Sequence, residues 1–161
     1  MNTLLGGNMS SRLFQEIREK RGLAYSVYSF ISSYADTGVL GAYSAVDPES
    51  AVETADIVIK EIRRLKENTV DKGELKDAVE YTKGCLLLSS ESTDSQMFRL
   101  AQNEINFGRT IPLPEIIEAI ESVKPEEIKA LASSLFSPDN LSLTLLGPFS
   151  DRKRLESILT L

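Results

Sequence analysis

Two side chains in the first part of the chain are of types that suit the binding of a carbonyl oxygen. Arg18 and Tyr25 are seven residues apart, and Gly22 between them marks a point where the chain can turn back. A guanidinium and a phenol are both hydrogen-bond donors, and the guanidinium is always charged. Brought together by such a turn, the pair suits a carbonyl oxygen or an oxyanion that develops there. From the residues alone, the alternative is a solvated helix end followed by an ordinary strand tyrosine.

Composition excludes several kinds of chemistry. The 161 residues include no histidine and a single cysteine. Serine–histidine and cysteine–histidine catalysis are therefore excluded, as are zinc sites built from imidazole or from four thiolates. The formal net charge of −6 argues against generic nucleic-acid binding, which needs a basic surface. No apolar run approaches the roughly 20 residues that span a bilayer, so no membrane span is predicted.

Three further features have weaker chemical signals. The glycine-rich residues 5–11 could cradle a phosphate but lack P-loop spacing, so we interpret Gly6 and Gly7 as a left-handed helix stop before a new helix. Cys85 stands beside three leucines in a predicted helix, which indicates a buried, inert thiol. The acidic candidates for proton transfer are interpreted as solvated or helix-end charges, and they are Glu16, Glu19, Glu126 and Glu127.

Pattern and turn chemistry predict the elements that position these residues. Residues 24–35 and 39–46 favour two strands joined by a turn, which makes a β-hairpin. Leucines that alternate with polar residues predict a further strand at 141–146. Helices are expected from Asn8 or Ser10 to about residue 20, and at about 48–66, 71–89, 93–107, 112–123 and 125–135, with a short tail helix from about Asp151.

This order of elements predicts an α+β fold, with an antiparallel sheet and helices packed on one of its faces. Residues 1–161 are expected to form a single domain. Three strands are few for so many helices, so we expect that at least one strand precedes Met1 and that the chain is a fragment. One position in the sheet would then be vacant or filled by a neighbouring molecule.

Residues 5–29, LGGNMSSRLFQEIREKRGLAYSVYS, closely resemble the pitrilysin-type zinc peptidases, above all the mitochondrial processing peptidase branch and its bacterial relatives. The resemblance extends over the hairpin, the helical middle and the final leucine-rich segment. It implies a clam shell of two related halves, of which the first carries an H-x-x-E-H zinc motif and the second, C-terminal half carries no metal. Arg18 and Tyr25 match the arginine and tyrosine of the second half. Their implied role is to bind the substrate carbonyl and to stabilise the tetrahedral intermediate.

The resemblance also implies partners and a cofactor. Because this chain has no histidine, zinc would be bound by an N-terminal half or a partner subunit, and the chain alone would be inactive. The substrate would be an extended peptide that pairs with a sheet edge. A cytoplasmic, bacterial-type location is expected, and a dimer is compatible with the family. The alternative is a non-catalytic partner or structural subunit of a processing-peptidase-like complex, which an H-x-x-E-H motif upstream of Met1 would contradict.

Overall fold

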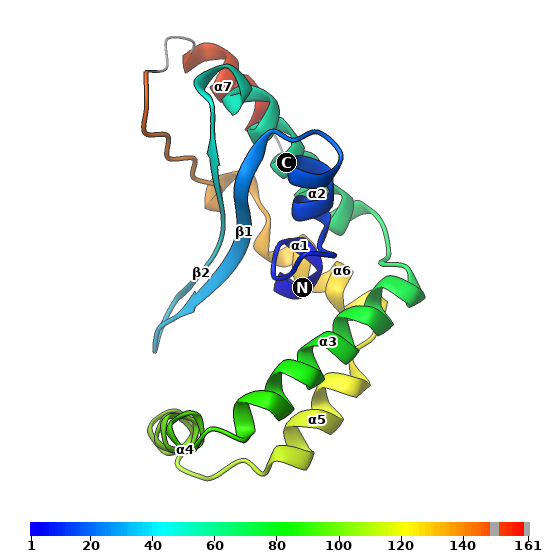
Figure 1. The fold of residues 1–161 in the computed structure, drawn as a ribbon, viewed down its shortest axis with the longest axis vertical. Coiled ribbons are helices and arrows are strands. Elements are labelled where there is room, and N and C mark those ends of the chain that lie inside the picture. The colour runs from blue at the N-terminus through cyan, green and yellow to red at the C-terminus, as the bar shows by residue number, and fades with distance from the viewer. Residues whose placement is uncertain (149–151, 160–161) are drawn as a thin grey trace. The chain divides into compact units, whose positions relative to one another are not determined.

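The computed structural model describes residues 1–148 and 152–159. The chain forms two compact units, Met1–Val70 with Glu126–Leu161 and, separately, Asp71–Pro125 (Figure 1). Among the described residues, no helix is both long enough and apolar enough to cross a membrane. The elements are α1 (Asn2–Leu5), η1 (Phe14–Glu19), β1 (Ala24–Ser33), β2 (Gly38–Val46), η2 (Pro48–Ser50), α2 (Ala51–Glu67), α3 (Lys72–Ser90), α4 (Thr93–Phe107), α5 (Leu113–Ser122), α6 (Pro125–Leu135), η3 (Pro138–Asn140) and α7 (Arg152–Ile158).

The predicted hairpin is confirmed in the first unit. β1 and β2 pair antiparallel, with Tyr28 opposite Tyr43, and the register shifts between Ala24 and Ser26. Side chains alternate across the strands, so Val27 and Ser29 are buried on the face that α1 and η1 contact, whereas Tyr28 is 44% exposed on the other face. The helices therefore cover one face of the hairpin, and the predicted α+β class is confirmed (Figure 1).

The expected third strand at residues 141–146 is wrong for the described part of the chain. There the sheet consists of β1 and β2, and the leucine-rich segment after η3 has no strand assignment. Alternating leucines favour an extended backbone, but a strand also needs a hydrogen-bonded neighbour. Of the alternating leucines, Leu143 and Leu145 are each 37% exposed, so the alternation does not produce a buried face here. The expected start of the tail helix at Asp151 lies outside the described residues.

Gly6 and Gly7 are needed for close packing and not for a left-handed turn. α1 ends at Gly6 as expected, but Gly6 has φ −158°, so the expected left-handed conformation is wrong. A Cβ on Gly6 would lie 2.5 Å from the backbone nitrogen of Ser29. That nitrogen donates a 3.0 Å hydrogen bond to the Gly6 carbonyl, and the Ser29 hydroxyl donates to the Asn2 side-chain oxygen at 2.6 Å. The close approach at Gly6 therefore allows the end of α1 to bond directly to β1.

We expect Gly6→Ala to lower the free energy of unfolding of this chain by about 1–3 kcal/mol, because the new methyl group must displace the β1 backbone. Gly84→Ala is a matched control, since no atom lies within 4 Å of its added Cβ and α3 is helical there. Alanine should stabilise a helix interior by about 0.5–1 kcal/mol relative to glycine. Urea unfolding followed by circular dichroism would compare the two variants. Equal stability of both would contradict the packing role of Gly6.

The second unit is built from α3, α4 and α5. The Asp71 carboxylate caps α3 by accepting hydrogen bonds from the backbone nitrogens of Gly73 and Glu74, as its position before the helix predicts. α3 contacts both α4 and α5, and the Lys83 ammonium lies 2.6 Å from the Glu121 carboxylate on α5. The hydrogen bond to Glu121 raises the pKa of Lys83 above its ordinary value.

The expectation that Cys85 is buried is wrong. Its thiol is exposed, and the neighbouring Leu88 is 70% exposed. Within α3 the buried residue is Leu75, whereas Leu86 is half-buried and Leu87 is 45% exposed. A run of apolar residues indicates a tendency to be buried, but it does not say which helix face finds a partner.

Candidate functional site

Arg18 is carried by η1, a helical segment that is wound more widely than an α-helix. The backbone nitrogen of Lys20 donates to the carbonyl of Gln15, five residues earlier, at 3.0 Å, which is the π-helical pattern. Leu13 and Ile17 are completely buried and fix the inner face of the segment. Arg18 follows Ile17 and its side chain is 37% exposed. The segment therefore packs against the core on one face and presents Arg18 on another.

Gly22 ends this segment and turns the chain into β1. Its φ of 62° is left-handed, a conformation that costs other residues energy. The nitrogen of Gly22 donates to the Arg18 carbonyl at 3.0 Å, and the nitrogen of Leu23 donates to the Ile17 carbonyl at 2.9 Å. The first bond runs from a left-handed glycine to the carbonyl four residues earlier, which is the αL motif that commonly ends helices. The turn that the sequence predicted at Gly22 is therefore formed by a helix-ending motif.

The structure places the Arg18 and Tyr25 side chains together. The guanidinium carbon of Arg18 lies 4.7 Å from the centre of the Tyr25 ring and 4.9 Å from the centre of the Phe14 ring. Arginine is attracted to the face of an aromatic ring at such distances, because the ring carries negative charge on its face. Arg18 is thus held between two rings, and its Nε lies 3.9 Å from the Glu19 carboxylate.

Tyr25 stands at an irregularity of the hairpin. Ala24 pairs with Val46 and Ser26 pairs with Ala45, so Tyr25 has no residue directly opposite it on β2. A bulge of this kind changes the direction of a side chain relative to the regular alternation. Tyr25 is 85% exposed, the most exposed tyrosine of β1. Its phenol is therefore available to a ligand while its ring contacts Arg18.

Phe14 is a member of this cluster that the sequence analysis did not identify. The signal was available, since Phe14 and Arg18 are four residues apart and such pairs lie on the same side of a helix. The apolar spacing of Phe14 with Leu13 and Ile17 predicts instead that all three lie on one buried face of the helix. The structure separates them, because Leu13 and Ile17 are fully buried and Phe14 is only half-buried.

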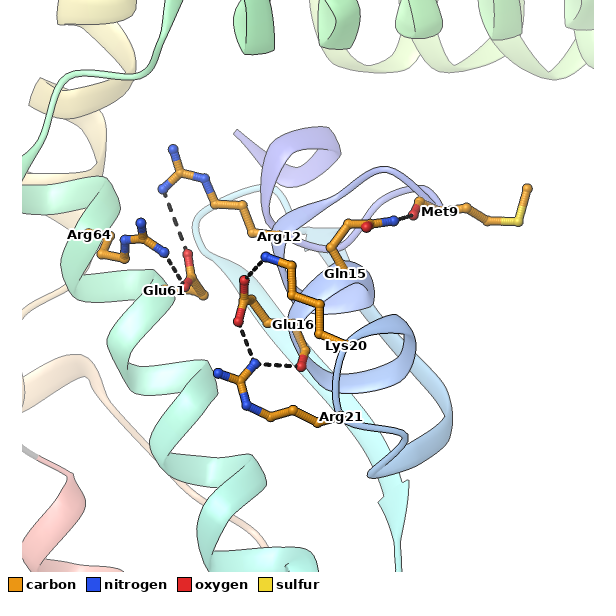
Figure 2. A network of polar contacts seen from close by, with 8 residues as sticks. All are labelled: Met9, Arg12, Gln15, Glu16, Lys20, Arg21, Glu61 and Arg64. Carbon is orange, nitrogen blue, oxygen red and sulfur yellow. Dashed lines mark hydrogen bonds and ion pairs between the residues drawn. The ribbon is translucent and has the colours of Figure 1, made fainter.

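A second set of charged side chains, those of Glu16, Lys20 and Arg21, interacts along η1 and just after its end (Figure 2). Glu16 accepts from the Lys20 ammonium at 2.5 Å and also pairs with the Arg21 guanidinium, which in addition donates to the Glu16 backbone carbonyl at 2.8 Å. The hydrogen bond from Lys20, followed by that from Arg21, holds the pKa of Glu16 below its ordinary value. The carboxylate therefore stays charged at neutral pH, and its stabilising contribution is lost only as the pH falls through that lowered pKa.

The acidic candidates for proton transfer lie in ion pairs or at a helix end, as the sequence predicted. Glu16 is engaged with Lys20 and Arg21, and Glu19 is close to Arg18. Glu126 and Glu127 are exposed in the first turn of α6, where negative charge complements the helix dipole. In the described residues, no three acidic, cysteine or histidine side chains gather closely enough to hold a metal ion. The structure thus groups Arg18, Tyr25 and Phe14, and leaves Cys85 and the α6 carboxylates outside that group.

Curated bacterial proteins resemble this chain along most of its length. It is 41% identical to the uncharacterized zinc protease YmxG of Bacillus subtilis over 148 residues, which are 92% of this chain and 36% of that protein. It is 37% identical to an uncharacterized zinc protease of Streptomyces coelicolor over 153 residues, 95% of this chain and 33% of that protein. The chain therefore spans about a third of the length of the curated relatives that it matches.

Solved structures share the fold. A peptidase M16 inactive domain from Pseudomonas fluorescens matches with a TM-score of 0.71 and 24% identity, over 83% of this chain and 32% of that one. A conserved protein from Enterococcus faecalis matches with a TM-score of 0.70 and 22% identity, over 81% of this chain and 30% of that one. At these identities the likeness shows the fold alone.

The family assignment comes from the first half of the sequence. Residues 1–81 match the family described as the peptidase M16 inactive domain, and this range contains η1, Gly22, β1 and β2. The match includes the stretch from which the resemblance to pitrilysin-type and processing peptidases was inferred, and that inference is confirmed. This protein belongs to the peptidase M16 family and corresponds to the C-terminal half that carries its inactive domain.

Proposed function

We propose that this chain is the substrate-binding half of a zinc-dependent metalloendopeptidase, called here the parent peptidase, in which a separate half binds the metal. The observation that carries the proposal is the position of Arg18 over the exposed Tyr25 ring, at 4.7 Å, on the segment that matches the family. The relatives named as zinc proteases support the reaction class. The resemblance in the sequence supports the assignment of these two residues to the substrate carbonyl.

The donor set of this chain does not fit zinc. Zinc in proteins is bound by histidine, cysteine and carboxylate groups, three or four at a time. This chain has no histidine, and its one cysteine, on α3, interacts with the Tyr81 side chain and not with further zinc ligands among the described residues. A metal-dependent reaction would therefore need ligands from another segment, and the residues of this chain would act on the substrate.

The two donors would act on the oxygen that gains negative charge. The Arg18 guanidinium donates charge-assisted hydrogen bonds, which are about twice as strong as neutral ones. It would hold the substrate carbonyl in the ground state. The Tyr25 hydroxyl would donate to the same oxygen when the carbonyl carbon becomes tetrahedral. Donors fixed in place before the reaction stabilise that charge without further reorganisation. The contacts of the guanidinium with the Phe14 and Tyr25 rings would keep it in place.

We expect the isolated chain to have no peptidase activity and no tightly bound zinc, and to restore activity when it is mixed with the zinc-binding half of the parent peptidase. The reason is that the chain lacks the metal ligands but carries the two donors. Metal analysis and a quenched-peptide assay would check this, with circular dichroism to show that the chain is folded. Stoichiometric zinc together with chelator-sensitive turnover by the chain alone would contradict the proposal. A folded chain that binds the other half without restoring turnover would favour a structural subunit.

A further inference from the structure

A buried carboxylate on α2 faces the segment that carries Arg18. The Glu61 side chain is only 5% exposed, although its residue type is almost never buried without a partner. Its Oε1 accepts a hydrogen bond from Arg64 at 2.8 Å. Its Oε2 has no hydrogen-bond partner among the described residues and lies 4.0 Å from the Arg12 guanidinium. Figure 2 shows Glu61 pointing from α2 toward Arg12.

Arg12 lies just before η1, so its contacts can set the orientation of that segment. It comes two residues before Phe14, the first residue of the segment, and next to the fully buried Leu13. Packing by Leu13 and Ile17 fixes the depth of η1, but apolar contacts have little directional preference. The ion pair between Arg12 and Glu61 of α2 depends on direction, so it fixes the orientation of the start of η1. A small rotation there would move Phe14 and Arg18 relative to Tyr25, which is fixed on β1.

We propose that Glu61 is a positioning residue for Arg18, which acts through Arg12 to set the orientation of η1 against β1. The inference rests on the proposed function of Arg18 in substrate binding. Among the described residues, Glu61 pairs with Arg64 and Arg12, so its effect on Arg18 is through Arg12. Glu61 would hold the start of the segment, while Glu16 pairs with Lys20 and Arg21 toward its end. The burial of Glu61 also supports this role. Burying a charge lowers stability unless the charge is paired, so a carboxylate that served only solubility would not be buried here.

The test uses Glu61→Gln in the parent peptidase, since glutamine keeps the shape and removes the charge. We expect kcat/KM to fall by about tenfold or more, because small misplacements of binding groups can cost up to about a hundredfold in rate. Zinc content should not change. The matched control is Asp56→Asn on the same helix, whose carboxylate pairs with Lys60 at 2.5 Å on the exposed side. This control should keep kcat/KM within about twofold, because surface ion pairs contribute little.

A double-mutant cycle with Arg18→Ala separates positioning from general stability. If Glu61 acts through Arg18, then Glu61→Gln should have little further effect in the Arg18→Ala background. An equal fractional loss in both backgrounds would overturn the positioning role, as would unchanged kcat/KM in folded Glu61→Gln. If Glu61→Gln does not fold, Arg12→Gln decides by the same cycle, because the Arg12 side chain is 18% exposed and is the other end of the pair. Arg18→Ala without effect in the wild-type background would instead refute the proposed function itself.

Discussion

Replacement of Tyr25 by phenylalanine in the parent peptidase should lower kcat by about a hundredfold or more, with unchanged zinc content. Removal of one donor to a developing oxyanion typically costs about 2.7–4 kcal/mol in the transition state. Phenylalanine keeps the aromatic ring, so the contact with the Arg18 guanidinium at 4.7 Å is retained. The change therefore isolates the hydroxyl from the position of Arg18. Steady-state kinetics with a quenched peptide and metal analysis of the same preparation would measure both quantities.

Tyr28→Phe is the matched control for this substitution. Tyr28 is on the same strand and 44% exposed, and its ring lies 5.1 Å from that of Tyr43, away from Arg18. Loss of its hydroxyl should leave kcat within about twofold, because it would serve no oxyanion. Normal turnover by Tyr25→Phe, or an equal loss in both variants, would remove the Tyr25 hydroxyl from the mechanism.

Arg18→Ala should lower kcat/KM by about a hundredfold and also raise KM, because a charged donor acts on the ground-state carbonyl as well as on the oxyanion. Stability should change little. The contact between Arg18 and the two rings is partly exposed and is worth about 0.5–1 kcal/mol. The ion pair with Glu19 at 3.9 Å is a surface pair, worth about 0–1 kcal/mol. The expected loss of activity is larger than either term, so unfolding would not explain it.

The combined variant tests whether both groups serve one oxygen. Losses from Arg18→Ala and Tyr25→Phe should be less than additive, as is found for residues that act as a unit. Arg109→Ala is the control for loss of an exposed arginine, since Arg109 pairs with Glu115 in the other unit at 2.6 Å. We expect its kcat/KM to be unchanged. Fully additive losses would mean that Arg18 and Tyr25 act on different parts of the substrate.

Local signals in the sequence were sufficient for most of the helices and for the hairpin. The signals that end an element involve only neighbouring residues, so residue type is enough to predict them. Examples are the Asp71 cap before α3, Gly108 with φ 62° after α4 and the turn before β2. The family motif was also local, because residues 5–29 contain the helix, the turn and the strand that present Arg18 and Tyr25. Those predictions needed no knowledge of distant contacts.

Contacts between distant segments decided the rest. The sequence could not show that Gly6 is required by the approach of Ser29, which lies 23 residues later, or that the Cys85 face of α3 has no cover in its unit. Nor could it show that Glu61 on α2 faces Arg12 at 4.0 Å. The types and spacing of Arg18 and Tyr25 by themselves predicted a pair of hydrogen-bond donors, and the resemblance implied that the pair binds a substrate carbonyl. Only the tertiary structure decided how the pair is held, because the contacts of η1 with β1 and α2 join segments that are distant in the sequence, and sequence spacing does not encode such packing.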